Sequence, residues 1–288
     1  MTKRNVTKAF LWAAAVLLTF VALIAVWLVL DARRTPIGTP EYVALGSSYA
    51  AGAGLGPRQP GSPRLCQRSN NGYPPRLARH LGLSLVDMTC SGSVTSDALN
   101  GGQFFQNAQI RTISPATKLV TVTAGGNDVG FVRDLFLLSS RNSDTWFGWM
   151  VRTFWGGPPN LGGRGFDKME STLASLIRTI RRQAPFARIV VATYPAVLPR
   201  DGTCSQLRLA RSEAEVMRQV QSVLAARTRE VARREGAIVV DMTTIGTGHS
   251  ACSATPWTRG WGPLAEAPFH PNEAGASATS QAIAAALR

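Results

Sequence analysis

The sequence is poor in histidine and cysteine. Three histidines and four cysteines occur in 288 residues, and no two cysteines have the C-x-x-C spacing of a zinc knuckle. No helix-turn-helix pattern and no internal repeat is present, and the Gly-Lys-Ser/Thr string of a phosphate-binding loop is missing. The string Gly52-Ala53-Gly54-Leu55-Gly56 has the wrong spacing for G-x-G-x-x-G. We therefore expect no metal site, no nucleotide and no other cofactor.

Acidic residues are also scarce, because 17 Asp and Glu face 31 Lys and Arg and leave a formal net charge of +14. Such a charge is compatible with binding nucleic acid, but the arginines are spread along the chain and no nucleic-acid-binding motif accompanies them. A protein that works outside the cytoplasm beside anionic lipid or cell-envelope polymer carries the same balance. The charge therefore favours an envelope location without nucleic acid as a partner.

One long apolar run, Ala9–Leu30, contains 22 residues without a charge, which is about the length that crosses a hydrocarbon core. Positive charge is heavier before the run than after it, so the remainder of the chain should face outward. This predicts a cytoplasmic tail at 1–8, a transmembrane signal anchor at 9–30, a linker at 31–40 and one domain at 41–288. Secretion after signal cleavage is the alternative, but the run is longer than a typical signal core and no clean Ala-x-Ala site follows.

An extracytoplasmic location predicts that the cysteines form disulfides, since thiols outside the cytoplasm tend to be oxidised. Cys66, Cys90, Cys204 and Cys252 permit three pairings. Sequential pairing, Cys66 with Cys90 and Cys204 with Cys252, is the simplest of them. Such bridges are expected to brace loops.

Short apolar runs alternate with helical patterns along residues 41–288. Buried strands are expected near residues 42–45, 83–88, 119–123, 189–193 and 237–240, and helices near 74–81, 168–184, 211–235 and 274–287. Asn272 is a candidate cap for the last helix and Gly236 a stop for the preceding one. Near-continuous apolar strands between helices predict a three-layer α/β/α domain with a parallel sheet.

The segment 131–166 fits this pattern least well, because it is rich in aromatic residues and glycine without a clean period. One interpretation is a helix and loop that pack onto the sheet. The other is a lid or acyl-binding wall beside a catalytic crevice, in contact with lipid. The sequence leaves both interpretations open.

Four polar or glycine positions follow predicted strands, where open α/β sheets place their chemistry. Ser48 comes just after the first strand and is the candidate nucleophile. His270 precedes the last helix and is the candidate general base. Gly92 leaves its N–H open to approach, and the Asn127 amide can donate to the same oxyanion as Gly92 and the Ser48 N–H. Each position alone is an ordinary turn residue, but their joint placement predicts an acyl-transfer site.

These positions lie in four segments of the chain, Ala44-Leu45-Gly46-Ser47-Ser48-Tyr49, Gly92, Gly126-Asn127-Asp128 and His270-Pro271-Asn272. In this order the segments resemble the four blocks of the SGNH/GDSL hydrolase family over nearly all of 41–288. The resemblance implies a flavodoxin-like fold with a five-stranded parallel sheet, ester hydrolase, lipase or deacetylase activity, and the sequential disulfides of secreted actinobacterial esterases.

Two positions depart from that family. Ser47 stands where relatives carry the aspartate before the nucleophile, and Ala267 stands three positions before His270, where relatives often carry an orienting aspartate. Similar enzymes that lack this aspartate use a main-chain carbonyl, so we expect the carbonyl of Ala267 to orient His270. A Ser-His dyad with an oriented carbonyl is chemically sufficient, because the third member fixes the tautomer and does not take the proton.

The sequence thus predicts a membrane-anchored, extracytoplasmic serine esterase or lipase whose substrate is an acyl ester of a lipid or glycan. A membrane-anchored acyltransferase or deacetylase acting on envelope glycans or lipids remains an alternative. A non-catalytic envelope-binding module is another, since both aspartate positions are lost. Acyl-chain length and oligomeric state are not predicted by any pattern in the chain.

Overall fold

A computed structural model describes residues 3–34 and 38–288. Its centre is a five-stranded parallel sheet in the order β2-β1-β3-β4-β5. The strands are β1 (Tyr42–Gly46), β2 (Leu85–Asp87), β3 (Leu119–Thr123), β4 (Arg188–Ala192) and β5 (Ile238–Val240). All five strands predicted from the apolar runs are confirmed, although β2 is shorter than expected.

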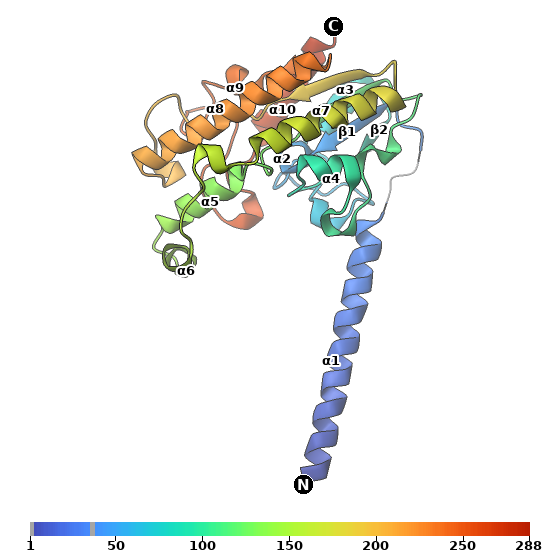
Figure 1. Cartoon of the computed structure of the whole chain (residues 1–288), viewed down its shortest axis with the longest axis vertical. Coiled ribbons are helices and arrows are strands. Elements are labelled where there is room, and N and C mark those ends of the chain that lie inside the picture. Colours follow the sequence, from blue (N-terminus) through green and yellow to red (C-terminus); the bar gives the residue numbers. More distant parts are fainter. Residues whose placement is uncertain (1–2, 35–37) are drawn as a thin grey trace.

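Helices cover both faces of the sheet (Figure 1). Along each strand the side chains alternate between two apolar clusters, because successive residues of a strand point to opposite faces. On one face, Val43 and Leu45 of β1 pack with helices α4 (Thr95–Asn100), α5 (Phe131–Arg141), α7 (Phe166–Gln183) and α8 (Arg211–Arg234). On the other, Tyr42 and Ala44 pack with α3 (Tyr73–Leu81) and α10 (Glu273–Ala286). The three-layer α/β/α architecture follows from this alternation.

The predicted helix ends are confirmed where capping residues occur. Asn272 accepts a hydrogen bond from the Gly275 N–H at 2.9 Å and so caps α10. Gly236 follows α8 with φ +71°, a conformation that glycine adopts without strain. Two single-turn helices, α2 (Ser48–Ala51) and α9 (Met242–Ile245), were not predicted, since a single turn carries no periodic pattern.

Helix α1 (Lys3–Ala32) projects from the domain as a single rod (Figure 1). Its span Phe10–Ala32 has a mean hydropathy of 2.8 and is long and apolar enough to cross a membrane. The predicted linker at 31–40 is wrong at its start, because α1 continues through Ala32 and Asp31 is buried. Asp31 accepts a hydrogen bond from the Arg64 N–H at 2.7 Å, which explains its burial. Linker residues 35–37 and tail residues 1–2 lie outside the described residues.

The aromatic-rich segment 131–166 forms two helices and a short turn. Helix α5 is partly buried against α8, whereas α6 (Trp146–Phe154) packs on α5 and leaves Trp146, Trp149 and Phe154 exposed. A 3-10 turn, η4 (Leu161–Gly163), leads back to α7. The segment therefore packs onto the domain through α5 and presents an apolar outer face through α6.

Two disulfides join loops that leave the carboxyl ends of the strands. Cys66 pairs with Cys90, and Cys204 pairs with Cys252, as sequential pairing predicts. The first bridge ties the loop after β1 to the loop after β2, and the second ties the loop after β4 to the loop after β5. Both bridges therefore brace the edge of the sheet at which Ser48 lies.

Candidate active site

The nucleophile candidate stands on a sharp turn at the end of β1. Gly46 has φ +138°, and a Cβ there would lie 2.2 Å from the carbonyl oxygen of Thr123, so only glycine fits. The Ser47 N–H donates to this same carbonyl at 3.0 Å, after which the chain turns into α2. Ser48 is therefore the first residue of α2, at the carboxyl edge of the sheet.

The structure brings Ser48 and His270 together although 222 residues separate them. The Ser48 Oγ lies 2.7 Å from Nε2 of His270, which is hydrogen-bond distance. Nδ1 of His270 lies 2.9 Å from the carbonyl oxygen of Pro268. A proton on Nδ1 donates to that carbonyl and leaves the Nε2 lone pair facing the serine hydroxyl. This arrangement suits transfer of the serine proton to histidine.

The carbonyl at hydrogen-bond distance from the imidazole belongs to Pro268 and not to Ala267 as predicted, although the Ala267 backbone also acts on the ring and raises its pKa. The Ala267 carbonyl accepts the backbone N–H of His270 at 3.3 Å, while the Pro268 carbonyl reaches the ring. Ala267 has φ +50° and Phe269 has φ +64°, so the loop is not extended at these two residues. Two left-handed residues flanking Pro268 turn its carbonyl toward the imidazole.

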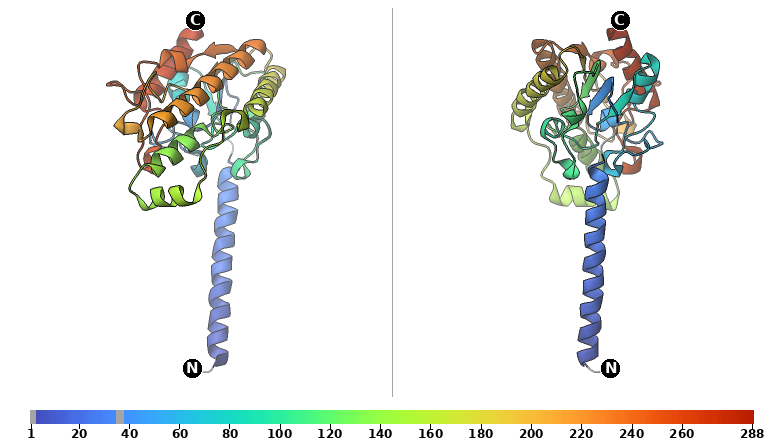
Figure 2. Two further views of the ribbon diagram at one scale, coloured as in Figure 1. Left: turned by 60° about the vertical axis from the view of Figure 1, so that its left-hand side comes forward. Right: turned by 90° about the vertical axis from the view of Figure 1, so that its right-hand side faces the viewer.

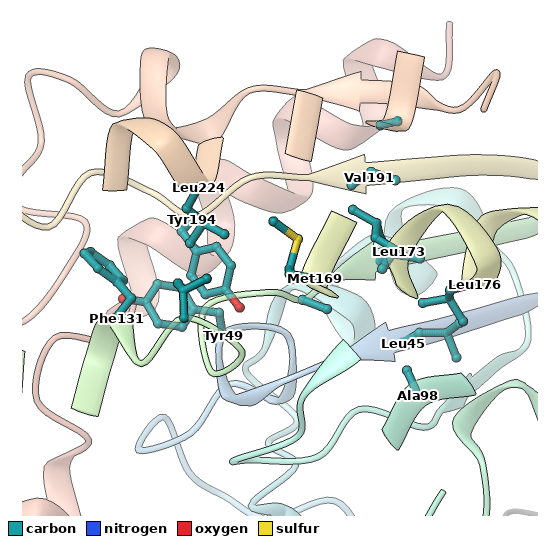
Figure 3. Packing of buried hydrophobic residues seen from close by; sticks show 14 of the residues in the cluster. Leu45, Tyr49, Ala98, Phe131, Met169, Leu173, Leu176, Val191, Tyr194 and Leu224 are labelled. Atoms are coloured by element: carbon teal, nitrogen blue, oxygen red, sulfur yellow. The ribbon is translucent and has the colours of Figure 1, made fainter. Parts of the chain in front are cut away.

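Tyr49 braces this histidine loop from the nucleophile side. Its buried hydroxyl donates to the carbonyl of Phe269, and its ring centroid lies 5.0 Å from that of His270 (Figure 3 shows Tyr49 beside Tyr194). Burial raises the pKa of the Tyr49 phenol well above its ordinary value, so the group stays protonated and remains a donor. Tyr49, which follows Ser48, thus holds the backbone of Phe269, which precedes His270.

The pKa of His270 is lowered to about 4, chiefly by burial and also by the positive charge of Arg259, while the hydrogen bonds to the Pro268 and Ala267 backbone act in the opposite direction. The His270 side chain is half-buried beside the ring of Tyr49. A histidine with a lowered pKa is neutral at pH 7 and ready to accept a proton.

We expect the acid limb of kcat/KM to lie below the ordinary histidine pKa of 6.5. Arg259→Gln should move this limb to higher pH, because a nearby positive charge no longer disfavours the imidazolium, whereas Arg259→Lys should leave it in place. The acid limb of each variant is measured from the release of 4-nitrophenol from its acetate ester at a series of pH values, with the absorbance read after alkalinisation. Superimposable limbs for the two variants would contradict the assignment.

The same shift has a consequence for stability. Because the pKa of His270 is lower in the folded chain than in the unfolded chain, the unfolded chain binds the proton first. This contribution to the free energy of unfolding is therefore fully present above pH 6.5 and is lost as the pH falls from 6.5 toward about 4.

Ser47, which replaces the family aspartate, is buried and uses a hydroxyl contact instead. Its Oγ lies 3.1 Å from the hydroxyl of Tyr194, which also accepts the N–H of Gly126 at 3.0 Å. Burial raises the pKa of Tyr194 to about 12 and keeps it protonated. Tyr194 therefore links the nucleophile turn to the turn that carries Asn127, without a buried carboxylate.

The turn that carries Asn127 contacts the loop after β2 that carries Gly92. The Asn127 side-chain amide donates to the carbonyl of Ser93 at 2.8 Å, and Asp128 accepts the Thr95 N–H at 2.9 Å. Gly92, just before Ser93, has φ +82° and is exposed. Hydrogen bonds from the turn after β3 thus hold the loop that carries Gly92. The second N–H of the Asn127 amide can donate to another acceptor.

Gln109 is a buried side chain at this site that the sequence did not reveal. Its Oε1 accepts the Gly46 N–H at 2.8 Å, and its Nε2 donates to the Gly46 carbonyl at 3.1 Å and to the Ser93 hydroxyl at 3.0 Å. One amide thus joins the nucleophile turn to the loop of Gly92. Gln109 lies in a 3-10 turn, η3 (Gln109–Thr112), where no motif marks it.

Within residues 3–34 and 38–288, no three His, Cys, Asp or Glu side chains gather as metal ligands would. A hollow of about 400 Å³ lies beside α8 and is lined by residues such as Leu198, Gln221 and Thr243. It contains none of Ser48, Gly92, Asn127 and His270, so the Ser-His pair rather than this hollow defines the candidate site.

A parallel α/β/α sheet with a Ser-His pair at its carboxyl edge is the arrangement of a serine ester hydrolase. Residues 44–278 match the model of the GDSL-like Lipase/Acylhydrolase family, and the chain belongs to this family of carboxylic ester hydrolases. It is 34% identical over 259 residues to Lipase 2 of Streptomyces coelicolor, a match that covers 85% of this chain and 84% of that protein.

Two solved structures are similar to this one. Phospholipase A1 from Streptomyces albidoflavus NA297 matches with a TM-score of 0.68 and 28% identity, over 86% of this chain and 99% of that one. An extracellular lipase from Streptomyces rimosus matches with a TM-score of 0.69 and 27% identity, over 85% of this chain and 98% of that one.

Proposed function

We propose that this protein hydrolyses carboxylic acyl esters by double displacement through Ser48 and His270. The observation that carries the proposal is the 2.7 Å contact between Ser48 Oγ and His270 Nε2, with the opposite ring nitrogen held by Pro268. Lipase and phospholipase relatives support an acyl ester as the substrate.

In the first half-reaction His270 takes the Ser48 proton as the serine oxygen attacks the acyl carbonyl. The resulting imidazolium gives this proton to the leaving alcohol, and an acyl ester remains on Ser48. In the second half-reaction His270 takes a proton from water, whose oxygen attacks the acyl-enzyme. The carboxylic acid departs as the proton returns to Ser48.

We assign the N–H groups of Ser48 and Gly92 and the Asn127 amide to the oxyanion that forms in each half-reaction. Ser48 lies in the first turn of α2, where backbone N–H groups have no acceptor within the helix. Asn127 is held by Ser93, so the amide is oriented before substrate arrives. Preorganised donors of this kind stabilise the transition state without reorganising during the reaction.

We further propose that α1 is an uncleaved anchor and that the hydrolase domain at 41–288 lies outside the cytoplasm. The apolar span Phe10–Ala32 supports the anchor, and the two disulfides support an oxidising compartment. The burial of Asp31 against Arg64 joins the end of α1 to the domain, a contact that supports retention of the helix in the working protein.

A fluorophosphonate probe tests the nucleophile directly. We expect the full chain to form one covalent adduct, which peptide mapping places on Ser48, because a base-activated serine attacks the phosphorus centre. Ser48→Ala should lose this adduct, and Ser47→Ala, which removes a neighbouring hydroxyl bonded to Tyr194, should keep it. The assignment is falsified if the adduct persists in Ser48→Ala, and no adduct on the parent would favour a non-catalytic binding module.

A further inference from the structure

Large apolar side chains are exposed on three short elements of the domain outside α1. They include Phe104 and Phe105 on the 3-10 turn η2 (Gln103–Phe105), Trp146, Trp149 and Phe154 on α6, and Leu264 on the 3-10 turn η6 (Leu264–Glu266). We call these six residues the apolar rim. Phe154 is 77% exposed, and Trp146 and Leu264 are each 71% exposed. Soluble surfaces seldom gather such residues without a partner.

The apolar rim borders the candidate active site. Turn η2 begins at Gln103, whose Nε2 would lie 2.9 Å from a Cβ placed on Gly92. Turn η6 ends one residue before Ala267, in the loop that carries His270. Helix α6 packs on α5, which follows the turn of Asn127. Turns η2 and η6 thus adjoin segments that carry Gly92 and His270, and α6 reaches the Asn127 turn through α5.

Helix α1 leaves the domain from this same side. Asp31 near its end accepts the N–H of Arg64 in the 3-10 turn η1 (Arg64–Cys66), and the Arg64 guanidinium lies 5.6 Å from the ring centroid of Trp27. Turns η1 and η2 both contact α1. The views in Figure 1 and Figure 2 show α6 on the side of the domain toward which α1 projects. A bilayer spanned by α1 would therefore meet the rim.

Arginines lie on this side of the domain beside the acidic Glu266 of turn η6 and would meet anionic headgroups. A crevice of about 290 Å³ opens beside the junction with α1 and is lined by Arg58 and Arg64 together with Leu264 of the rim. Arg152 lies on α6 among the exposed aromatic residues. Aromatic side chains next to arginines are typical of surfaces that sit at the level of lipid headgroups.

The backbone holds two rim residues outward at a cost. Phe104 has φ +46° and Phe105 has φ +63°, in a backbone region that residues other than glycine seldom adopt. Their side chains are 45% and 63% exposed, so the strain is not offset by burial within the domain. A partner that buries both rings would offset it.

We infer that the apolar rim sits in the headgroup layer of the bilayer that α1 spans, so that the active site faces this bilayer and takes acyl-ester lipids from its outer leaflet. The inference rests on the proposed anchor and deepens the proposed esterase function. Helix α1 and the apolar rim would together hold the Ser48 turn at a fixed height over the bilayer. Lipid acyl esters are concentrated in the outer leaflet directly below it.

Spin labelling tests the contact without relying on catalysis. All four native cysteines are in disulfides, so one introduced cysteine carries the only nitroxide. The full chain of Phe154→Cys or Phe104→Cys is placed in nanodiscs of phosphatidylcholine and phosphatidylglycerol. We expect both labels to be accessible to oxygen and shielded from a water-soluble nickel chelate, as lipid-immersed groups are.

Two reference positions distinguish a failure of the docking from a failure of the anchor on which it rests. Leu18→Cys, in the middle of α1, should report lipid. Phe186→Cys should report water, because Phe186 is 93% exposed and precedes β4, at the opposite edge of the sheet. A label on residue 18 in lipid with labels on 104 and 154 in water overturns the docking alone. A label on residue 18 in water overturns the anchor as well. Labels shielded from both reagents would indicate a protein partner and also overturn the inference.

Activity then tests the consequence for substrate access. The triple variant Trp146→Ser/Trp149→Ser/Phe154→Ser should hydrolyse 4-methylumbelliferyl oleate in nanodiscs about tenfold more slowly than the parent, because apolar area no longer enters the bilayer. Its hydrolysis of the water-soluble acetate ester should be unchanged, and Phe186→Ser should match the parent on both esters. Equal losses on both esters would overturn the inference, whereas an inactive parent with immersed labels would overturn the esterase function and leave the docking intact.

Discussion

His270→Ala should lower kcat on a soluble acetate ester by roughly 10⁴-fold or more, since the serine hydroxyl loses the base that takes its proton. In the structure His270 Nε2 is the ring nitrogen in contact with Ser48 Oγ. In the proposed mechanism the imidazole also gives the proton to the leaving alcohol, so both half-reactions should slow together. The remaining rate should reflect only substrate binding and the oxyanion donors.

His249→Ala is the matched control for this loss. His249 stacks on Trp257 with ring centroids 4.1 Å apart, and its Nδ1 lies 2.7 Å from the carbonyl oxygen of Thr255. These contacts are with Trp257 and Thr255 and none is with Ser48, so its removal should leave kcat close to the parent value. A similar loss of kcat in both variants would show that the chain depends on general loop packing rather than on a base.

The double variant Ser48→Ala/His270→Ala sharpens the same test. Groups that act as one unit are not additive, so the double variant should be no slower than either single variant. Initial rates with folded protein, checked by far-ultraviolet circular dichroism and thermal melting, measure all three. If the two losses multiply, the residues do not form a dyad.

The sheet and its catalytic edge could be predicted because they rest on local patterns. Buried parallel strands are continuous apolar runs, and β3 begins and ends at the residues that the sequence predicts. Since the carboxyl ends of such strands meet at one edge, residues at those ends could be grouped without knowing any distance. That grouping placed Ser48 and His270 together, and their 2.7 Å contact agrees with it.

The carbonyl that orients His270 could not be predicted in the same way. Choosing between Ala267 and Pro268 requires the backbone angles of the loop, and the left-handed angles of Ala267 and Phe269 are ones that alanine and phenylalanine rarely adopt. Tertiary contacts impose them, among them the bond from the Tyr49 hydroxyl to the Phe269 carbonyl, across 220 residues of sequence. The family resemblance therefore pointed to Ala267 instead of the neighbouring Pro268.

The side chains that join the loops of the candidate site could not be predicted from the sequence for a related reason. Gln109 bonds to Gly46 across 63 residues, and Tyr194 bonds to Ser47 across 147 residues. Neither residue belongs to a motif, and a glutamine or tyrosine near a strand is ordinarily a surface or core residue. Only the folded chain shows that these side chains connect the nucleophile turn to the other loops of the site.

Asn127→Ala should lower kcat by about 10²–10³ while the fold is retained, which is the usual loss when one oxyanion donor is removed. The Asn127 amide donates to the carbonyl of Ser93, so one of its N–H groups orients the side chain and the other is left for the oxyanion. The developing negative charge on the substrate oxygen strengthens this second bond only in the transition state, so KM should change little.

Asn127→Asp separates donation from packing. Aspartate keeps the shape of the side chain but replaces the NH2 group, and with it both N–H donors, by an oxygen; the resulting carboxylate repels an oxyanion and cannot donate to the Ser93 carbonyl. We expect it to be at least as slow as Asn127→Ala, and fluorophosphonate labelling of Ser48 to be slower in both variants. Steady-state kinetics with a soluble ester measures the effect. If Asn127→Asp keeps the parent kcat, the amide is not an oxyanion donor, and the oxyanion depends on the backbone N–H groups of Ser48 and Gly92.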